Sequence, residues 1–546
     1  MRSLPTACLL LAAALPLIAQ EHTGHGRGAV VGHVHLAVAT NPRAAAAFDR
    51  GIALLHSFEY DDAATAFREA EASDPALALA YYGEALTYRH ILWREEDLKA
   101  AHAALEKLGP DRAARLGRTP SGRDRSVADA VEALYAPGKE SLRADAFADS
   151  MRAAARRYPS EPELRAFTAI AILGDAYFYR DTAALRMRLE AAALAEGVLA
   201  ANPEHPGAAH YIIHAYDTPA LAGRGLAAAE RYASIAPSAE HALHMPSHIF
   251  LQLGRWKDVE RSNVAANNAS RAWVAQHHVG AEKRDLHALD WLAYSLVQQG
   301  RLSEARAVLD TVGHLVAIGK FATDDLESVD LGEVIAMYLA WDGGVRSALD
   351  APKPAAFARY AVPRPSAVNS AAMQAFLASS LRSAWRGDSV SASANARAFR
   401  AFADTNTVGA PRWYKVQATQ LEALAAAARG DTLGAIGMLR QAANAERTLP
   451  VWSGPYWGVP AGELLGSMLL ASGHARESAD AFSDALQLRH GAAAPLLGRA
   501  RARWAAGDHA RAAEDYRELA NNWHSADPSL PNLDEVRLRS RAPATK

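Results

Sequence analysis

The chain has 546 residues, which is long enough for two or three ordinary domains or for one extended repeat array. Its 58 basic and 60 acidic residues give a formal net charge of −2, and this balance gives no indication of a basic surface that follows nucleic-acid phosphates, so we expect no nucleic-acid partner. Hydrophobic residues make up 50% of the chain and aromatic residues only 8%, so the composition favours helices almost throughout.

The first residues have the pattern of an export signal. Arg2 supplies a positive start, residues 7–18 are apolar but too few to span a bilayer, and Ala19 is a small residue at a cleavage point. We therefore expect a signal peptide over residues 1–19 and a periplasmic or secreted protein that begins at or near Gln20.

Residues 20–42 contain several glycines and histidines and are expected to form a flexible leader. The single cysteine, Cys8, lies within the predicted signal, so the mature chain is expected to have no disulfides and no thiolate metal ligands. No later stretch approaches the length of a membrane span.

A helix-pair pattern extends over residues 43–349. In residues 48–75, small and aromatic residues recur at spacings that let two helices touch, and a proline closes the second helix. These residues are Gly51, Ala63, Phe67, Ala70 and Pro75. Units with the same character occur at residues 296–309, 469–486 and 504–519.

In these residues the chain resembles the tetratricopeptide repeat (TPR) superfamily. The resemblance implies an all-α, right-handed α-solenoid of roughly ten or more helix pairs, a fold that most often binds proteins or peptides in a groove. Four prolines over residues 350–365 interrupt the pattern and predict a linker between two subarrays. The second array is expected over residues 366–524, followed by a loosely ordered tail over residues 525–546.

Histidines are concentrated in two consecutive repeats. Pro203 and Pro237 each close a helix and lie 34 residues apart, which is one repeat length. The units that follow carry histidines at their fifth and ninth positions, and residues four apart share one helix face. These histidines are His210 and His214 in the first unit, and His244 and His248 in the second.

The TPR resemblance implies that these positions face the concave groove. Neighbouring helices pack about 8–10 Å apart, so imidazoles from both can meet at one ion about 2.0–2.1 Å from each nitrogen. The ordinary alternative is that each histidine is a packed or solvent-bonded residue. Further candidate ligands lie within one turn or in the next unit: His241, Asp217, His287 and Asp290. Pro246 should kink the helix between His244 and His248.

Imidazole ligands without thiolate suit a divalent metal ion such as zinc, copper or iron. The segments HYIIH and HALHMPSH also resemble exported, histidine-rich bacterial TPR proteins, a resemblance that implies no catalytic role. Two functions remain open. The first is a solenoid that holds a metal and binds a protein or peptide in its groove. The second is a metal-dependent hydrolase or oxidase that uses the same histidines, although no standard catalytic motif is present.

Overall fold

The structure is a computed structural model that describes residues 29–120, 122–318, 383–384, 386–405, 411–449 and 459–541. Within these residues the protein is all-α, as the sequence predicted. The one sheet in the described part is a two-stranded antiparallel ribbon of β1 (Arg89–His90) and β2 (Glu95–Glu96). The predicted signal peptide (residues 1–19) and the proline-rich linker (350–365) lie outside the described residues.

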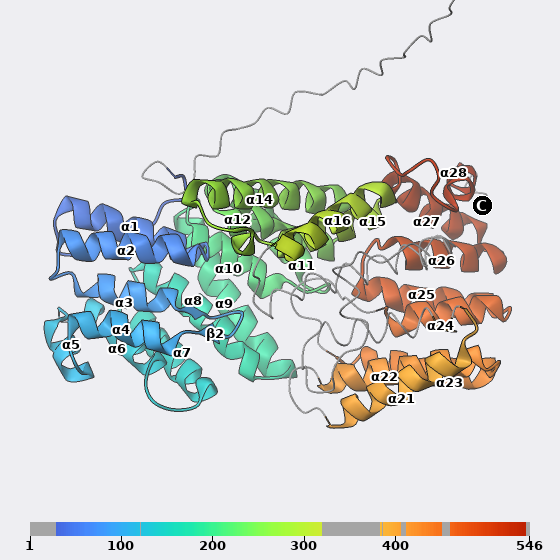
Figure 1. Cartoon of the computed structure of the whole chain (residues 1–546), viewed down its shortest axis with the longest axis horizontal. Coiled ribbons are helices and arrows are strands. Elements are labelled where there is room, and N and C mark those ends of the chain that lie inside the picture. Colours follow the sequence, from blue (N-terminus) through green and yellow to red (C-terminus); the bar gives the residue numbers. More distant parts are fainter. Residues whose placement is uncertain are drawn as a thin grey trace, which may run out of the picture.

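The first array runs from blue to yellow in Figure 1, and its consecutive helices pack against one another. It comprises α1 (Pro42–His56), α2 (Tyr60–Ser73), α3 (Ala78–Thr87), α4 (Leu98–Leu108), α5 (Arg112–Arg118), α6 (Arg123–Leu134), α7 (Glu140–Arg157), α8 (Pro162–Asp175), η1 (Ala176–Phe178), α9 (Asp181–Ala201), α10 (Pro206–Tyr216), α11 (Ala222–Ile235), α12 (Glu240–His244), α13 (Pro246–Gln252), α14 (Trp256–His277), η2 (Ala281–Lys283), α15 (His287–Gln298) and α16 (Leu302–Ile318).

The second array runs from orange to red and ends beside α15 (Figure 1). It comprises α21 (Ser389–Thr405), α22 (Pro411–Ala428), α23 (Thr432–Glu446), α24 (Ala461–Ala471), α25 (Ala475–Leu488), α26 (Ala493–Ala505), α27 (His509–Asn522) and α28 (Leu533–Arg539). The Trp256 indole donates to the carbonyl oxygen of Gly491 at 2.9 Å, and Nδ1 of His490 lies 2.7 Å from the carbonyl oxygen of Gln252. These bonds join the two arrays directly.

The glycine and phenylalanine spacing of the first repeat has a clear packing role. Phe67 of α2 is 1% exposed, and its ring lies between Gly51 of α1 and Gly83 of α3. A Cβ added at Gly51 or Gly83 would come within 2.7 or 2.5 Å of the ring. Only glycine allows helices to approach the ring this closely, so the repeat pattern follows from contact between three helices.

Two predictions about the chain ends are wrong for the described residues. The leader predicted as flexible over residues 20–42 packs on the array from residue 29, because Val31 and Leu36 are buried and the amide of His33 donates to Glu204 O. The tail predicted as loosely ordered contains α28, where Leu533 and Val536 supply an apolar face at helical spacing.

The predicted kink at Pro246 is present. Helix α12 ends at His244 and α13 begins at Pro246, with Met245 between them at φ −53° and ψ −35°. Proline has no amide hydrogen to continue the helical ladder, and the amide of His248 instead bonds the nearby carbonyl oxygen of Met245 at 3.1 Å. The helix is therefore interrupted between His244 and His248.

Candidate metal centre

The structure brings all six predicted histidines of α10, α12, α13 and α15 into two neighbouring groups. The first histidine trio is His210, His214 and His241, and the second histidine trio is His244, His248 and His287. In each trio one nitrogen per ring lies within 4.8 Å of the others. The expected set of four histidines around one ion is therefore divided between two trios, each completed by one additional histidine.

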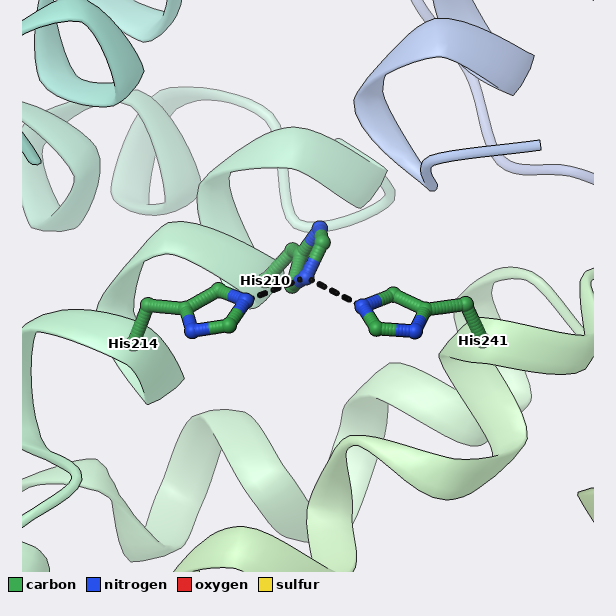
Figure 2. A group of neighbouring side chains, drawn as sticks. All are labelled: His210, His214 and His241. Atoms are coloured by element: carbon green, nitrogen blue, oxygen red, sulfur yellow. Dashed lines mark hydrogen bonds between the residues drawn. The ribbon is translucent and has the colours of Figure 1, made fainter. Parts of the chain in front are cut away.

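In the first histidine trio, two rings point at a third. Nε2 of His214 lies 2.9 Å from Nε2 of His210, and Nε2 of His241 lies 3.1 Å from the same atom. Figure 2 shows His214 and His241 approaching His210 from opposite sides. Both histidines of α10 face the same way because they are four residues apart on one helix.

In the second histidine trio, Nε2 of His244 lies 3.1 Å from Nε2 of His248. The ring of His287 stands 4.8 Å from the ring of His244, measured between centroids. Trp291, which is 1% exposed, packs against His244 and His248 with centroid distances of 5.0 and 4.3 Å. His244 and His248 are thus buried against Trp291, while His287 is exposed.

The proton positions in the first histidine trio follow from the partners of His210. Its Nδ1 lies 2.7 Å from the carbonyl oxygen of His56, and a carbonyl oxygen only accepts hydrogen bonds. Nδ1 of His210 must therefore carry the proton, and Nε2 of a neutral ring then presents a lone pair. This single lone pair faces both His214 and His241 and can accept a hydrogen bond from only one of them.

The hydrogen-bond partners of the second histidine trio leave a less favourable contact between its nitrogens than in the first trio. Nδ1 of His248 lies 2.6 Å from a carboxylate oxygen of Asp217, and Nδ1 of His244 lies 2.6 Å from Oδ1 of Asn263. Asn263 donates through its Nδ2 to the carbonyl oxygen of Val259, which leaves Oδ1 as the acceptor. Both rings therefore hold their proton on Nδ1, and two Nε2 lone pairs face each other across 3.1 Å.

Burial keeps most of these rings neutral. Burial lowers the pKa of His210 to about 3. The bond to the His56 carbonyl oxygen acts in the opposite direction, and repulsion from neighbouring histidines lowers the pKa further. Burial, followed by repulsion from nearby histidines, also holds the pKa values of His214, His241 and His244 well below the usual value of 6.5. Neutral imidazole is the form that binds metal.

The two predicted carboxylate ligands occupy different places from the trios. Asp217 is fully buried, and its carboxylate accepts from Nδ1 of His248 and from Nε2 of Gln252 at 3.0 Å. It therefore orients His248 from the side opposite Nε2. Asp290 is fully buried on α15, one turn after His287, and neither trio includes it.

A third cluster, of His56, Glu163 and His205, satisfies its own hydrogen bonds. His205 accepts at Nδ1 from the amide of Ala208, so its Nε2 donates to Glu163 at 3.1 Å. Nε2 of His56 donates to the other carboxylate oxygen at 2.9 Å, while its Nδ1 accepts from the Tyr211 hydroxyl at 2.7 Å. Although burial favours the neutral acid, the bonds from His205 and His56 lower the pKa of Glu163 below its usual value.

The buried network of His56, Glu163 and His205 therefore needs no metal ion, and it supports the first histidine trio through the His56 carbonyl oxygen. The sequence interpretation assigned His56 no ligand role, and the His56 side chain is fully buried. It missed Glu163, which lies 42 residues before His205 on another helix and belongs to no motif. No residue spacing in the sequence indicates that Glu163 lies beside these histidines.

A cavity of about 440 Å³ opens beside both trios. Its wall includes His241 from the first trio and His287 from the second. The other lining side chains are mainly acidic or aromatic, with one lysine: Phe58, Glu59, Tyr60, Asp61, Asp62, His90, Trp93, Glu240, Trp273, Lys283 and Asp285. Burial and the neighbouring Asp285 carboxylate raise the pKa of Glu240 well above its usual value.

No protein-family model and no curated protein matches the chain. Among solved structures it is similar to the Cut9–Hcn1 hetero-tetramer of the APC/C, with 11% identity, a TM-score of 0.34, and coverage of 91% of this chain and 76% of that chain. Naa15/Naa10 bound to HypK-THB has 12% identity, a TM-score of 0.22, and coverage of 91% and 74%.

The TPR domain of P58(IPK) has 12% identity, a TM-score of 0.19, and coverage of 85% of this chain and 98% of that chain. None of the described helices is long and apolar enough to cross a membrane. The successive described helices of the chain pack against one another, as the sequence predicted for an all-α array.

Proposed function

We propose that this protein is a TPR-like solenoid that binds divalent metal ions through its histidine trios. The observation that carries the proposal is the 3.1 Å contact between the Nε2 atoms of His244 and His248, whose Nδ1 protons both point at oxygen acceptors. A cation between the two lone pairs converts their repulsion into coordination. A divalent metal ion does this without adding a proton to a buried ring.

The spacing of the nitrogens agrees with metal coordination. Two nitrogens that each lie about 2.1 Å from one ion are about 3.4 Å apart at the tetrahedral angle typical of zinc, and about 3.0 Å apart at a right angle. The Nε2–Nε2 distances of 2.9 and 3.1 Å in the first trio, and of 3.1 Å in the second, are close to the right-angle value. Imidazole ligands without thiolate suit zinc, copper(II) or iron(II).

The cavity beside the trios supports binding of a protein or peptide partner next to the metal. Its acidic side chains outnumber its single lysine, Lys283, and Trp93 is 49% exposed at its wall. Acidic groups and exposed aromatic rings together favour a positively charged peptide segment. The partner that fits the cavity is therefore a basic peptide, and an acidic peptide of equal length is the matched comparison in a binding assay.

A metal-dependent hydrolase or oxidase is the second candidate, and one observation favours it. Each trio supplies three protein ligands, and metal sites with three protein ligands and an open position are typical of catalysis. His241 and His287 bring the trios to the wall of the cavity, where water or a substrate can reach them. Turnover of ester or peptide substrates that depends on added metal would favour this candidate over the binding protein.

Metal content tests the proposal directly. The full chain is loaded with Zn²⁺, dialysed and subjected to elemental analysis beside a His214→Ala/His248→Ala variant, which removes one ligand from each trio. We expect bound metal in the wild type and its loss in the variant, with an unchanged helical circular dichroism spectrum. The matched control is His102→Ala/His474→Ala, which removes two exposed histidines outside the trios and should keep the metal.

The competing occupant of the second trio is a proton on His248, which would form an ion pair with Asp217. Nitrogen NMR of the histidines distinguishes the two. A metal-free protein that binds no zinc, copper or iron and holds a charged His248 ring at neutral pH would refute metal binding and leave a proton-sharing network.

We also propose that the protein is exported, on the basis of Arg2, the apolar run over residues 7–18 and Ala19. Amino-terminal sequencing of protein from the native host should find the chain beginning at or near Gln20. Recovery of a cytosolic chain that retains Met1 would contradict export.

A further inference from the structure

We infer that the two histidine trios form a two-ion centre, in which each trio holds its own divalent metal ion with a different affinity. This inference rests on the proposed metal binding and adds a second site and an order of loading. The trios are close neighbours: ring centroids are 5.9 Å apart between His214 and His248, and 6.1 Å apart between His241 and His244.

A single ion cannot compensate the unfavourable nitrogen–nitrogen contacts of both trios. An ion bound among His210, His214 and His241 leaves the Nε2 atoms of His244 and His248 facing each other at 3.1 Å. An ion between His244 and His248 likewise leaves two nitrogens directed at the one lone pair of His210. Each trio has its own uncompensated contact, so each requires its own cation.

The groups that accept hydrogen bonds from the Nδ1 atoms of His248 and His210 differ in charge. His248 donates to the carboxylate of Asp217, which Gln252 holds in place, and this negative charge makes the imidazole a stronger ligand. His210 donates to the neutral carbonyl oxygen of His56. We therefore expect the second histidine trio to bind its ion more tightly and to fill first.

The two ions share one entrance. His241 belongs to the first trio and His287 to the second, and both line the same cavity. With three protein ligands each, both ions retain open positions, and His241 and His287 bring their trios to this cavity. A small ligand in the cavity can then reach either ion.

Calorimetric titration of the metal-free full chain with Zn²⁺ tests the inference. We expect two equivalents of zinc with separable affinities, one equivalent in His287→Ala and one in His241→Ala. The single site left in His241→Ala should be the tighter one. Asp217→Asn keeps a side chain of the same shape without its charge and should weaken only the tighter site, by about 10–100-fold. The control His102→Ala should bind as the wild type does.

The outcomes separate the inference from the proposed function. One equivalent in the wild type, lost in either single variant, would overturn the two-ion centre and leave a single metal site. No bound zinc in the wild type, with titrations of Cu²⁺ and Fe²⁺ equally negative, would overturn both. Equal weakening of two sites by Asp217→Asn would contradict the assignment of the tighter site to the second trio.

Discussion

Replacing Glu163 by glutamine should loosen α8 and α10, the second of which carries His210 and His214 of the first histidine trio. Glu163 is 1% exposed and accepts hydrogen bonds from Nε2 of His56 and of His205. A glutamine side chain has one oxygen to accept a bond, and its NH₂ group meets the second N–H, so one buried donor loses its acceptor. The lost bond to a charged group and the buried unsatisfied donor together cost about 3 kcal/mol.

Hydrogen exchange measures this cost locally, since a repeat array need not unfold as one cooperative unit. A loss of about 3 kcal/mol corresponds to a roughly 150-fold faster exchange of amides in α8 and α10 when exchange requires local opening. The experiment uses metal-free protein, so that bound metal does not mask the change. The control is Glu190→Gln, which breaks an exposed pair with Arg152 and should cost less than about 1 kcal/mol.

Unchanged exchange in α8 and α10 of Glu163→Gln would refute the hydrogen-bonded network. A complete loss of one zinc equivalent with unchanged exchange would show instead that His56, Glu163 and His205 bind a metal themselves.

Three further predictions concern packing and pH. A Cβ at Gly207 would meet the ring of His56 at 2.6 Å, so Gly207→Ala should destabilise α10 by about 1–3 kcal/mol and weaken zinc binding in calorimetric titration. Phe67→Ala should cost about 3–5 kcal/mol by removing the ring between three helices, which faster hydrogen exchange in α1 and α2 would report. Burial lowers the pKa of His210 to about 3, whereas an unfolded histidine titrates near 6.5, so the unfolded chain binds more protons between these values. Thermal denaturation of metal-free protein should therefore show a free energy of unfolding that is constant above about pH 6.5. Below that pH it should decrease by up to about 1.4 kcal/mol per pH unit for each such histidine. A free energy of unfolding that rises as the pH falls from 6.5 to 5 would contradict the buried neutral ring.

The repeat length allowed much of the histidine cluster to be predicted. The 34-residue interval places His210 and His214 in the same register as His244 and His248, and the structure brings all four close together. Their division into two trios, which also include His241 and His287, depends on packing between helices distant in sequence.

The role of Asp217 illustrates the same limit. Its position three residues after His214 indicated proximity to the histidines, but its carboxylate contacts His248 on another helix, through Nδ1 rather than the nitrogen that faces the trio. Glu163 lay beyond sequence reasoning because it meets His56 across 107 residues of chain. Such a contact follows from the path of the helices, which no local spacing specifies.

The most direct test of metal binding is an anomalous-difference map from a crystal of the full chain grown with Zn²⁺. We predict a peak in each histidine trio, about 2.1 Å from its histidine nitrogens. Peaks confined to other residues, with the six histidine rings hydrogen-bonded to one another or to water, would contradict a metal centre at this site.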